Sequence, residues 1–353
     1  MQGSPLTVTA LDIGGANLKA VGPDGKAVSR PFELWRRPEG LADALEDLLC
    51  TLGQADILAV TMTGELCDCF ETKSEGVHHC LDSARRASKH RGKQQLLVWS
   101  TEGKFLSLAD ALRDPLPVAA ANWLALAAFA GSLVPEESAL LVDVGSTTTD
   151  IVPLASGGHP APAGLTDTER LLCGELVYSG VSRTPIATVV RKVPYRGQLC
   201  PVSSELFATT QDAYLVLGSL KESPEDLDTA DGRPATRACA RDRLGRMVCA
   251  DRKTFSAEDA VVAARHIAST QAQQLQKAVE KVVGGHSSPV TSVVLSGSGE
   301  FLGGRAVAQT GARIVSLSSE LGRETSRAAT AHALAYLVQK ELAQKESTKR
   351  ASL

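Results

Sequence analysis

The sequence is poor in the features that bind membranes and nucleic acids. Aromatic residues make up only 4% of the 353 residues, and the net charge is −3 with a pI near 6.2. There is no basic face with interleaved aromatic side chains, which argues against nucleic acid as a partner. No apolar stretch has the length of a membrane span, and the Ala-rich run at 117–131 is too short. The first residues lead directly into a strand pattern, so we expect neither a signal peptide nor a membrane partner.

The eight cysteines are scattered, without the regular spacing of a disulfide-rich secreted domain. We therefore expect reduced thiols and a cytoplasmic protein. One cluster has metal-ligating residue types, namely Cys67, Cys69, His78, His79 and Cys80. Ordinary thiols are the favoured interpretation, because structural zinc sites prefer two ligand pairs separated by a longer, regular loop. A metal site at this cluster is the alternative.

The sequence does contain a pattern typical of phosphate binding at residues 140–154. An apolar run ends in Asp143, and a polar turn separates it from a second apolar run, which predicts a strand–turn–strand unit. The backbone N–H and hydroxyl donors that can cradle a phosphate belong to Gly145, Ser146, Thr147 and Thr148. A carboxylate beside them repels phosphate unless a cation lies between the two, so Asp143 is a candidate Mg²⁺ ligand.

A second copy of this pattern lies near the N-terminus. A strand pattern over 8–13 carries Asp12 and leads into a turn that contains Gly14, Gly15 and Asn17. Asp12 takes the place that Asp143 takes in the other copy. Lys19, just past the turn, adds a cation that can face phosphate. Two such turns in one chain predict a duplicated fold with two lobes.

A third element, at 292–308, has a buried strand pattern that leads into Gly297, Ser298 and Gly299 and then into a helix. A Gly-rich strand-to-helix turn lets the backbone approach a nucleotide, and a helix N-terminus favours anions. Taken in this order, the three elements resemble the phosphate 1, phosphate 2 and adenosine motifs of the actin-like ATPase superfamily.

That resemblance implies an α/β protein, with two lobes of the actin-like (ribonuclease H-like) fold and a central cleft between them. We expect the first lobe at 1–132, joined by a C-terminal helix at 326–344, and the second lobe at 133–325. The other expected elements are helices at 41–52, 106–113, 117–131 and 256–283 and strands at 57–62, 96–99 and 313–317. The tail from residue 345 is expected to be disordered.

Two further stretches are unusually rich in polar residues. The first, 61–77, follows a strand, and we expect a substrate-binding loop there because the rim at the carboxyl ends of strands is where clefts form. The second, 164–218, places Arg170 and Arg183 among Thr and Tyr hydroxyls, and such arginines can clamp a carboxylate or a diphosphate. The alternatives are a solvated loop for the first stretch and surface ion pairs for the arginines.

These stretches resemble the hydantoinase A/oxoprolinase family of that superfamily. More narrowly, they are similar to its short members in the tetrahydromethanopterin-linked one-carbon pathway. The motifs that carry the resemblance span nearly the whole chain: DIGGANLK, TMTGEL, VDVGSTTTDI, GELVY, VPYRG, FATT, ADGRP and LSGSGEFL. The resemblance implies a synthase of methanofuran biosynthesis. Such an enzyme joins an aminomethylfuran-methyl diphosphate to the phenol oxygen of γ-glutamyltyramine and releases diphosphate.

For this activity, Asp12 and Asp143 are the expected Mg²⁺ ligands, and the two turns are the expected diphosphate cradle. The base that activates the phenol is either Asp150 or Glu65, which the sequence does not separate. Lys73 is a further catalytic candidate.

The substrate-binding candidates are Thr63, Arg170 and Arg183, and the two arginines are expected to hold the glutamyl carboxylates. The intact element at 297–299 leaves ATP open as a cofactor besides Mg²⁺. The competing interpretations are therefore an ATP-dependent small-molecule kinase or a ring-opening amidohydrolase, and a non-catalytic nucleotide-switched scaffold. The last is disfavoured because the chain has no room for a peptide-binding domain. The expected partners are small-molecule substrates, and a homodimer is compatible with the sequence.

Overall fold

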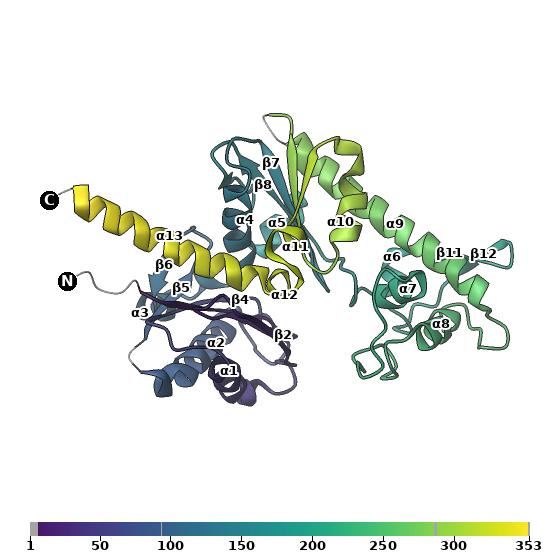
Figure 1. Ribbon diagram of the computed structural model, residues 1–353. Helices are drawn as coiled ribbons and strands as arrows, with labels where there is room; N and C mark the ends of the chain where they lie inside the picture. The colour runs from purple at the N-terminus through teal and green to yellow at the C-terminus, as the bar shows by residue number, and fades with distance from the viewer. Residues whose placement is uncertain (1–5, 93, 286–287, 352–353) are drawn as a thin grey trace. The chain divides into compact units, whose positions relative to one another are not determined.

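The computed structural model describes residues 6–92, 94–285 and 288–351 and divides the chain into two compact units (Figure 1). The first unit comprises Met1–Ala139, Leu154–Glu169 and Leu317–Leu353, and the second comprises Leu140–Pro153 and Arg170–Ser316. Both units combine a mixed sheet with helices, so the predicted α/β class is confirmed. The predicted lobe boundaries stay a prediction, and they place the segment 154–169 differently from these units.

The sheet of the first unit has six strands in the order β3-β2-β1-β4-β5-β6. Their bounds are β1 Val8–Ile13, β2 Asn17–Val21, β3 Ala27–Pro31, β4 Ile57–Met62, β5 Gln95–Trp99 and β6 Phe105–Ser107. Strand β4 is parallel to both β1 and β5, whereas β2, β3 and β6 pair antiparallel. Every residue of β1 and β4 is buried, because central parallel strands are covered on both faces.

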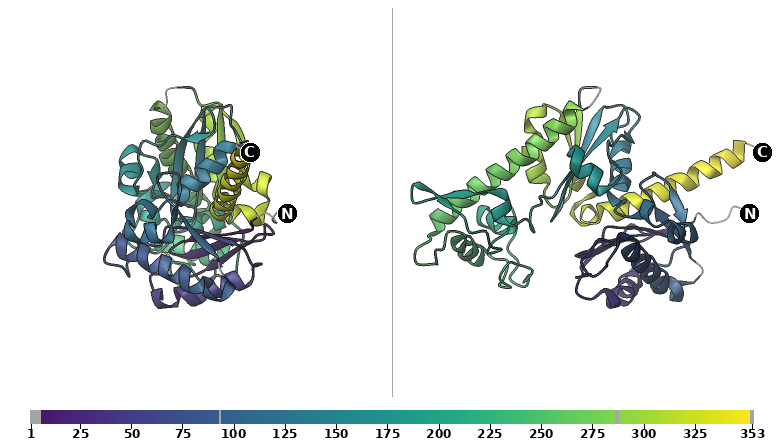
Figure 2. Two further views of the ribbon diagram at one scale, coloured as in Figure 1. Left: turned by 90° about the vertical axis from the view of Figure 1, so that its left-hand side faces the viewer. Right: turned by 180° about the vertical axis from the view of Figure 1, so that it is seen from behind.

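Helices cover both faces of this sheet. Figures 1 and 2 show α1 (Leu41–Cys50) and α2 (Lys73–Ser88) on one face and α13 (Ala329–Ala351) on the other. The remaining helices of the unit are α3 Leu108–Arg113, α4 Asn122–Ser132, α11 Leu317–Leu321 and α12 Arg323–Ser326, with 3-10 turns at Pro38–Gly40, Lys89–Arg91 and Leu116–Val118. Helix α13 packs against β1, β2, β4 and α4. The last helix of the chain thereby covers one face of the sheet that contains the first strand.

The prediction of a disordered tail from residue 345 is wrong for residues 345–351, because α13 continues to Ala351. Lys345 Nζ lies 2.6 Å from Glu341 Oε1, one helical turn away, and Thr348 Oγ1 donates to the Gln344 carbonyl at 3.0 Å. Such i, i+4 contacts favour the helical conformation in this last stretch. Residues 352–353 lie outside the described part of the chain.

The second sheet runs β10-β8-β7-β13-β14, with β9 paired to β8. The strands are β7 Ala139–Val144, β8 Thr149–Ala155, β9 His159–Pro160, β10 Leu176–Val177, β13 Ser292–Ser296 and β14 Arg313–Ser316. The long helix α9 (Ala257–Gly284) packs against α10 (Glu300–Val307), α7 (Thr210–Leu217), α8 (Arg237–Arg246) and the hairpin of β11 (Lys192–Tyr195) and β12 (Gln198–Pro201). The shorter elements are α5 Asp167–Cys173, α6 Ile186–Val189 and a 3-10 turn at Ala308–Thr310.

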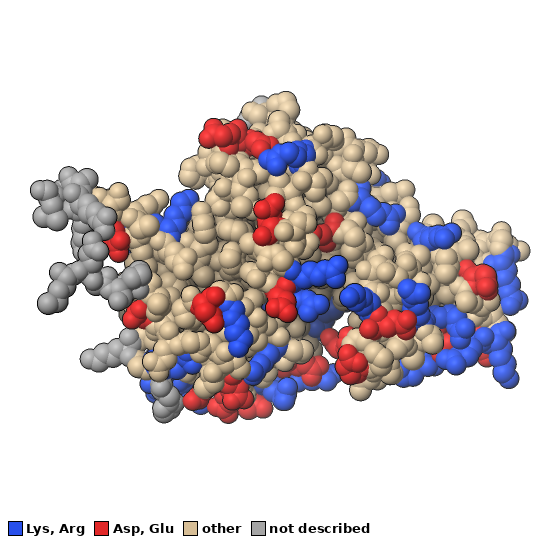
Figure 3. Space-filling view, in the orientation of Figure 1, with Lys and Arg blue, Asp and Glu red and all other residues tan. Residues whose placement is uncertain are grey.

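Lys and Arg side chains gather at the end of the second unit that α8 and the β11–β12 hairpin form (Figure 3). The exposed basic residues of this region are Arg191, Lys192, Arg196, Arg237, Arg246, Arg252 and Lys253. Within the described ranges, no helix combines the length and the apolar character that crossing a membrane requires.

Candidate active site

The turn between β1 and β2 forms the first part of the candidate site. Gly14 N donates to the Asn17 carbonyl at 3.0 Å, which closes the turn, and Leu34 N donates to the Gly15 carbonyl at 2.9 Å. Asp12 and Lys19 are directly opposite each other in the β1–β2 register, and Lys19 Nζ lies 3.7 Å from Asp12 Oδ2. The turn therefore places a carboxylate and an ammonium group next to backbone donors.

The Asp12 carboxylate is 3% exposed and only half satisfied. Its Oδ2 accepts a hydrogen bond from Thr330 Oγ1 of α13, while its Oδ1 has no hydrogen-bond partner among the described residues. A buried carboxylate oxygen without a donor is unusual, and a divalent cation would satisfy it. The donor set of Asp12 therefore fits Mg²⁺, which commonly takes one or two carboxylates and keeps several waters.

The stretch after β4 is not a loop throughout, as 61–77 was predicted to be. Residues Lys73–Val77 form the first turns of α2, because Thr72 Oγ1 accepts the Glu75 N–H at 3.1 Å and caps the helix. Ahead of the cap, Thr63 N and Gly64 N both donate to the Ile13 carbonyl at 3.0 Å. Thr63 therefore lies beside the β1–β2 turn.

The Glu65 backbone packs closely against the first turns of α2. A Cβ atom on Gly76 would lie 2.1 Å from the Glu65 carbonyl oxygen, so only glycine lets α2 approach so closely. The Glu65 side chain is 1% exposed, and neither of its carboxylate oxygens has a hydrogen-bond partner in the described residues. The carboxylate is thus buried without the donors that normally accompany such a group.

Burial raises the pKa of Glu65 to about 7, and the charge of Asp167 adds to the increase. Lys73 acts in the opposite direction, as do the nearby backbone N–H groups of Glu65 and Ala120, whose geometry falls short of a hydrogen bond. Lys73 Nζ is 3.5 Å from Asp167 Oδ2, so the three charged groups form one cluster within the first unit. Ala120 has φ 47°, a strained conformation for a non-glycine residue, and such strain is concentrated at functional sites.

The turn between β7 and β8 forms a separate part of the candidate site, in the second unit. Gly145 N donates to the Thr148 carbonyl at 2.9 Å, and the Ser146 carbonyl accepts from Ser182 N at 3.0 Å and from Arg183 N at 2.9 Å. Ser146, Thr147 and Thr148 are half-buried, and the Ser146 and Thr147 hydroxyl oxygens are 3.5 Å apart. The segment at 181–183 therefore fixes the turn through its backbone.

The element at 297–299 contacts this same turn. Gly299 N donates to the Val144 carbonyl at 2.9 Å. Gly297 has φ +87°, and a Cβ there would lie 2.3 Å from the Val144 oxygen and 2.7 Å from Asp143 Oδ1. Ser298 is exposed. The structure thus brings Asp143, the β7–β8 turn and the Gly-rich turn together.

Arg170 does not have the exposed position expected for a substrate clamp. Its side chain is 1% exposed, with Nη1 2.9 Å from Asp150 Oδ1 and Nη2 donating to the Glu175 carbonyl at 3.1 Å. These contacts place Arg170 in a buried ion pair and give Asp150 a cationic partner. Arg183 is more open: its side chain is 34% exposed, and its Nη1 lies 3.9 Å from Asp228 Oδ2.

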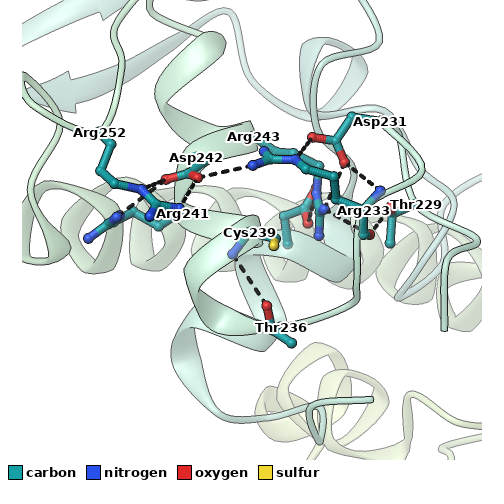
Figure 4. Close-up of polar contacts among 10 residues, drawn as sticks. Thr229, Asp231, Arg233, Thr236, Cys239, Arg241, Asp242, Arg243 and Arg252 are labelled. Carbon is teal, nitrogen blue, oxygen red and sulfur yellow. Dashed lines mark hydrogen bonds and ion pairs between the residues drawn. The ribbon is translucent and has the colours of Figure 1, made fainter. Parts of the chain in front are cut away.

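Residues of the ADGRP and FATT blocks meet in a buried ion-pair network around Arg243 (Figure 4). Arg243 Nε donates to Asp212 Oδ1 at 2.7 Å, and its Nη1 donates to Asp231 Oδ1 at 3.0 Å. Burial raises the pKa of Asp212 to about 6, and the charge of Arg243 opposes this increase. Asp242 accepts from Arg233 and Arg252 at the edge of the network. These blocks therefore hold α7, α8 and the intervening loop together.

The cysteine and histidine cluster has ordinary contacts. His78 bonds through its two ring nitrogens to the Ser74 and Leu112 carbonyls at 2.6 and 3.0 Å, and His79 Nε2 lies 2.8 Å from the Pro38 carbonyl. Cys80 is buried, which raises the pKa of its thiol. In the described part of the chain, no group of three or more His, Cys, Asp or Glu side chains is arranged to hold a metal ion.

Three residues of the candidate site were missed in the sequence: Asp167, Thr330 and Ala120. Asp167 lies in the same block as Arg170, which was recognised as a candidate region although Asp167 itself was not singled out. Thr330 lies in an Ala-rich helix and carries no motif. The backbone strain of Ala120 has no sequence signal.

Comparisons with known proteins agree with the motifs. The family model described as hydantoinase/oxoprolinase matches residues 56–341. A curated protein of Methanocaldococcus jannaschii is 33% identical over 96% of this chain and 99% of its own length. One of Methanococcus vannielii is 31% identical over 59% of this chain and 93% of its own length. Both are named (4-{4-[2-(gamma-L-glutamylamino)ethyl]phenoxymethyl}furan-2-yl)methanamine synthase.

Solved structures show only distant similarity to this chain. A nucleotide-free acetone carboxylase has a TM-score of 0.47 at 15% identity and covers 90% of this chain and 51% of its own. The archaeal actin homologue Ta0583 with ADP has a TM-score of 0.46 at 15% identity, with 95% and 99% covered.

Proposed function

The chain belongs to the hydantoinase/oxoprolinase family. Because it also matches two curated synthases along most of their length, we propose that it catalyses the synthases' ether-forming reaction. The substrates are an aminomethylfuran-methyl diphosphate and the phenol of γ-glutamyltyramine. The phenol oxygen forms a bond to the furan-bearing methylene carbon, and the bond from that carbon to diphosphate oxygen breaks. Diphosphate leaves with the bonding electron pair, and the phenol proton passes to a base.

The observation that carries this proposal is the state of Glu65. A general base works best when its pKa lies near the working pH, and burial brings the pKa of Glu65 to about 7. Its oxygens have no hydrogen-bond partner among the described residues, so a phenol hydroxyl that reached them would supply the missing donor. Asp150 is a weaker candidate because Arg170 lies 2.9 Å from it. We therefore assign the base to Glu65.

Diphosphate needs donors and cations that stabilise its developing charge. Within the first unit we assign phosphate binding to Gly14, Gly15, Asn17 and Lys19. Within the second unit we assign phosphate binding to Gly145, Ser146, Thr147 and Thr148. Asp12 and Asp143 are the proposed Mg²⁺ ligands, and Mg²⁺, when bound, would neutralise charge on the leaving group. The orphan Oδ1 of Asp12 supports the first of these assignments. Thr63 and Arg183 stay as proposed substrate-binding residues, since both adjoin one of the turns.

A second candidate function is ATP-dependent phosphoryl transfer or amide hydrolysis. It is favoured by the close contact of Gly297–Gly299 with Asp143 and Val144, which preserves a nucleotide-type turn. Calorimetric titration with Mg²⁺ plus ATP, and separately with Mg²⁺ plus diphosphate, distinguishes the two functions. Binding of diphosphate but not ATP supports the synthase.

The direct test mixes the purified protein with both substrates and Mg²⁺ and follows the ether product by mass spectrometry and diphosphate by a coupled assay. We expect equal amounts of both products from the wild type. The Glu65→Gln variant should lose activity, whereas Glu46→Gln, which makes the same change on α1, should retain it. Hydrolysis of ATP without ether formation would contradict the proposal.

A further inference from the structure

Three sequence blocks that are far apart in the chain meet in the first unit. Glu65 follows β4, Lys73 begins α2, and Asp167 begins α5. Lys73 Nζ lies 3.5 Å from Asp167 Oδ2, and the charges of both residues act on the Glu65 carboxylate. The proposed function assigns a role to Glu65 but none to Asp167.

Asp167 and Lys73 are both held in place by their own helices. Glu169 Oε2 accepts from Thr166 N at 3.0 Å, and Glu169 N donates to Thr166 Oγ1 at 3.3 Å, a reciprocal capping arrangement at the start of α5. This arrangement occupies Glu169 and leaves Asp167 to face Lys73. Thr72 caps α2 immediately before Lys73. The two charged groups are thus positioned by rigid backbone.

Lys73 and Asp167 do not form a short, direct hydrogen bond. Their 3.5 Å separation exceeds the roughly 2.8 Å of a charge-assisted hydrogen bond. The side chains are 30% and 24% exposed, so a ligand can reach both. A carboxylate accepts several hydrogen bonds, and Asp167 can accept another donor while it remains near Lys73.

The charges of the cluster are unbalanced when Glu65 is ionised. Two carboxylates then share one ammonium group, and Glu65 is buried with neither oxygen hydrogen-bonded in the described structure. A second cation would balance the cluster. The cluster therefore favours a cationic group on the ligand.

We propose that Asp167 binds the primary ammonium group of the aminomethylfuran substrate and so selects that substrate. The inference rests on the proposed function, in which Glu65 meets the phenol oxygen. Only the furan ring and its methylene carbons separate the ammonium group from the reacting oxygen. The α-ammonium of the glutamyl group lies beyond the whole tyramine chain, which is too far from Glu65 to favour Asp167. Proximity therefore selects the furan ammonium of the two amines.

The test compares two donors, the aminomethylfuran-methyl diphosphate and an analogue with methyl in place of aminomethyl. Both are assayed with the wild type, Asp167→Asn, and the control Asp82→Asn, which makes the same change at an exposed position of α2. We expect the wild type and Asp82→Asn to prefer the ammonium donor by about 10- to 100-fold in kcat/KM, as a charge-assisted hydrogen bond allows. Asp167→Asn should lose most of this preference, because its kcat/KM should fall for the ammonium donor only.

A binding titration with furfurylamine and furfuryl alcohol keeps the test independent of turnover. The wild type should bind the amine more tightly than the alcohol, and Asp167→Asn should bind the two equally. If the wild type uses neither donor, the proposed function fails, while the titration still tests the amine site.

Two results would overturn the inference itself. One is an Asp167→Asn enzyme whose kcat/KM falls equally for both donors, or which still prefers the amine in both the activity assay and the binding titration. The other is a variant that instead loses discrimination between γ-glutamyltyramine and an acceptor without the α-amino group, which would assign Asp167 to the glutamyl end.

Discussion

Thr330, the second residue of α13, donates a hydrogen bond to Asp12 Oδ2 across 318 positions of sequence. Thr330 is buried, and the contact fixes the rotation of a carboxylate whose other oxygen has no partner among the described residues. A residue far from any motif thus orients the proposed Mg²⁺ ligand, as residues around metal ligands commonly do.

Thr330→Val should therefore weaken Mg²⁺ binding without unfolding the protein, because valine has a similar shape but no hydroxyl. We expect an increase of about 10-fold in the Mg²⁺ concentration that gives half-maximal activity, the typical effect of losing such a support. Asp12→Asn and Asp143→Asn should each abolish Mg²⁺-dependent activity. Mg²⁺ titrations of activity, together with Mn²⁺ binding followed by electron paramagnetic resonance, measure these changes. Thr348→Val, on an exposed turn of the same helix, is the control.

Activity should rise with pH through a pKa of about 7 if Glu65 is the base, since only its ionised form accepts the phenol proton. Glu65→Gln should remove this limb of the pH profile and lower kcat by about 100-fold or more. Measurement of kcat from pH 5 to 9 decides the point. A full-rate Glu65→Gln enzyme, or an unchanged profile, would return the role to Asp150.

The same carboxylate should make folding stability depend on pH. The pKa of Glu65 is near 4.5 in the unfolded chain and about 7 in the folded protein, so the folded state binds more protons between these values. The contribution of Glu65 to stability is therefore fully present below pH 4.5 and is lost as pH rises through 7, by about 3 kcal/mol in total. Urea unfolding at pH 5 and pH 8 should show this loss in the wild type and not in Glu65→Gln.

Arg243→Met should strongly destabilise the second unit. The substitution leaves Asp212, which is 1% exposed, without its cationic partner, and breaking a buried pair costs about 3–5 kcal/mol. Arg252→Met is the control, because Arg252 is 60% exposed and solvent weakens its pairing with Asp242. Hydrogen exchange at α7 and α8 measures the loss of stability in both variants. Equal protection in the two variants would show that the network does not hold the helices.

Gly297→Ala and Gly311→Ala separate backbone strain from loss of the close contact. Both glycines have positive φ, but a Cβ at Gly311 meets nothing within 4 Å, whereas one at Gly297 overlaps the Val144 carbonyl. Each should lose about 1 kcal/mol of stability from strain. Only Gly297→Ala should also displace the turn at Asp143 and abolish binding of ATP or diphosphate in calorimetry. Equal binding by both variants would remove 297–299 from the site.

The parts of the site that depend on local sequence could be predicted, and those that depend on distant contacts could not. The turns after Asp12 and Asp143 lie where the Asp-x-Gly pattern predicts them, because a glycine turn between apolar strands is a short-range signal. The burial of Arg170 could not be predicted, because an arginine among Thr and Tyr residues has the same sequence pattern whether it is buried or exposed. Its burial follows from the pairing with Asp150, which no local pattern reveals.

In the fold, too, the elements set by local sequence could be predicted, and those set by distant contacts could not. Strand β4 was predicted with its observed bounds, since a continuous apolar run between polar turns defines a buried strand. The helix expected at 106–113 is instead strand β6 followed by α3, because Phe105–Ser107 pairs with β5. Such pairing depends on a partner strand outside the segment, and it overrides the local preference.

The position of α13 on the first sheet has a consequence for synthesis. Residues 170–316 form a separate unit between the strands that begin the first unit and the helix that covers them. A ribosome therefore releases the whole second unit before α13 can shield β1, β2 and β4. During that interval one apolar face of the first sheet stays uncovered, and the second unit can fold while the first still waits for its last layer. The hydrogen bond from Thr330 to Asp12 can therefore form only after the whole second unit has been synthesised.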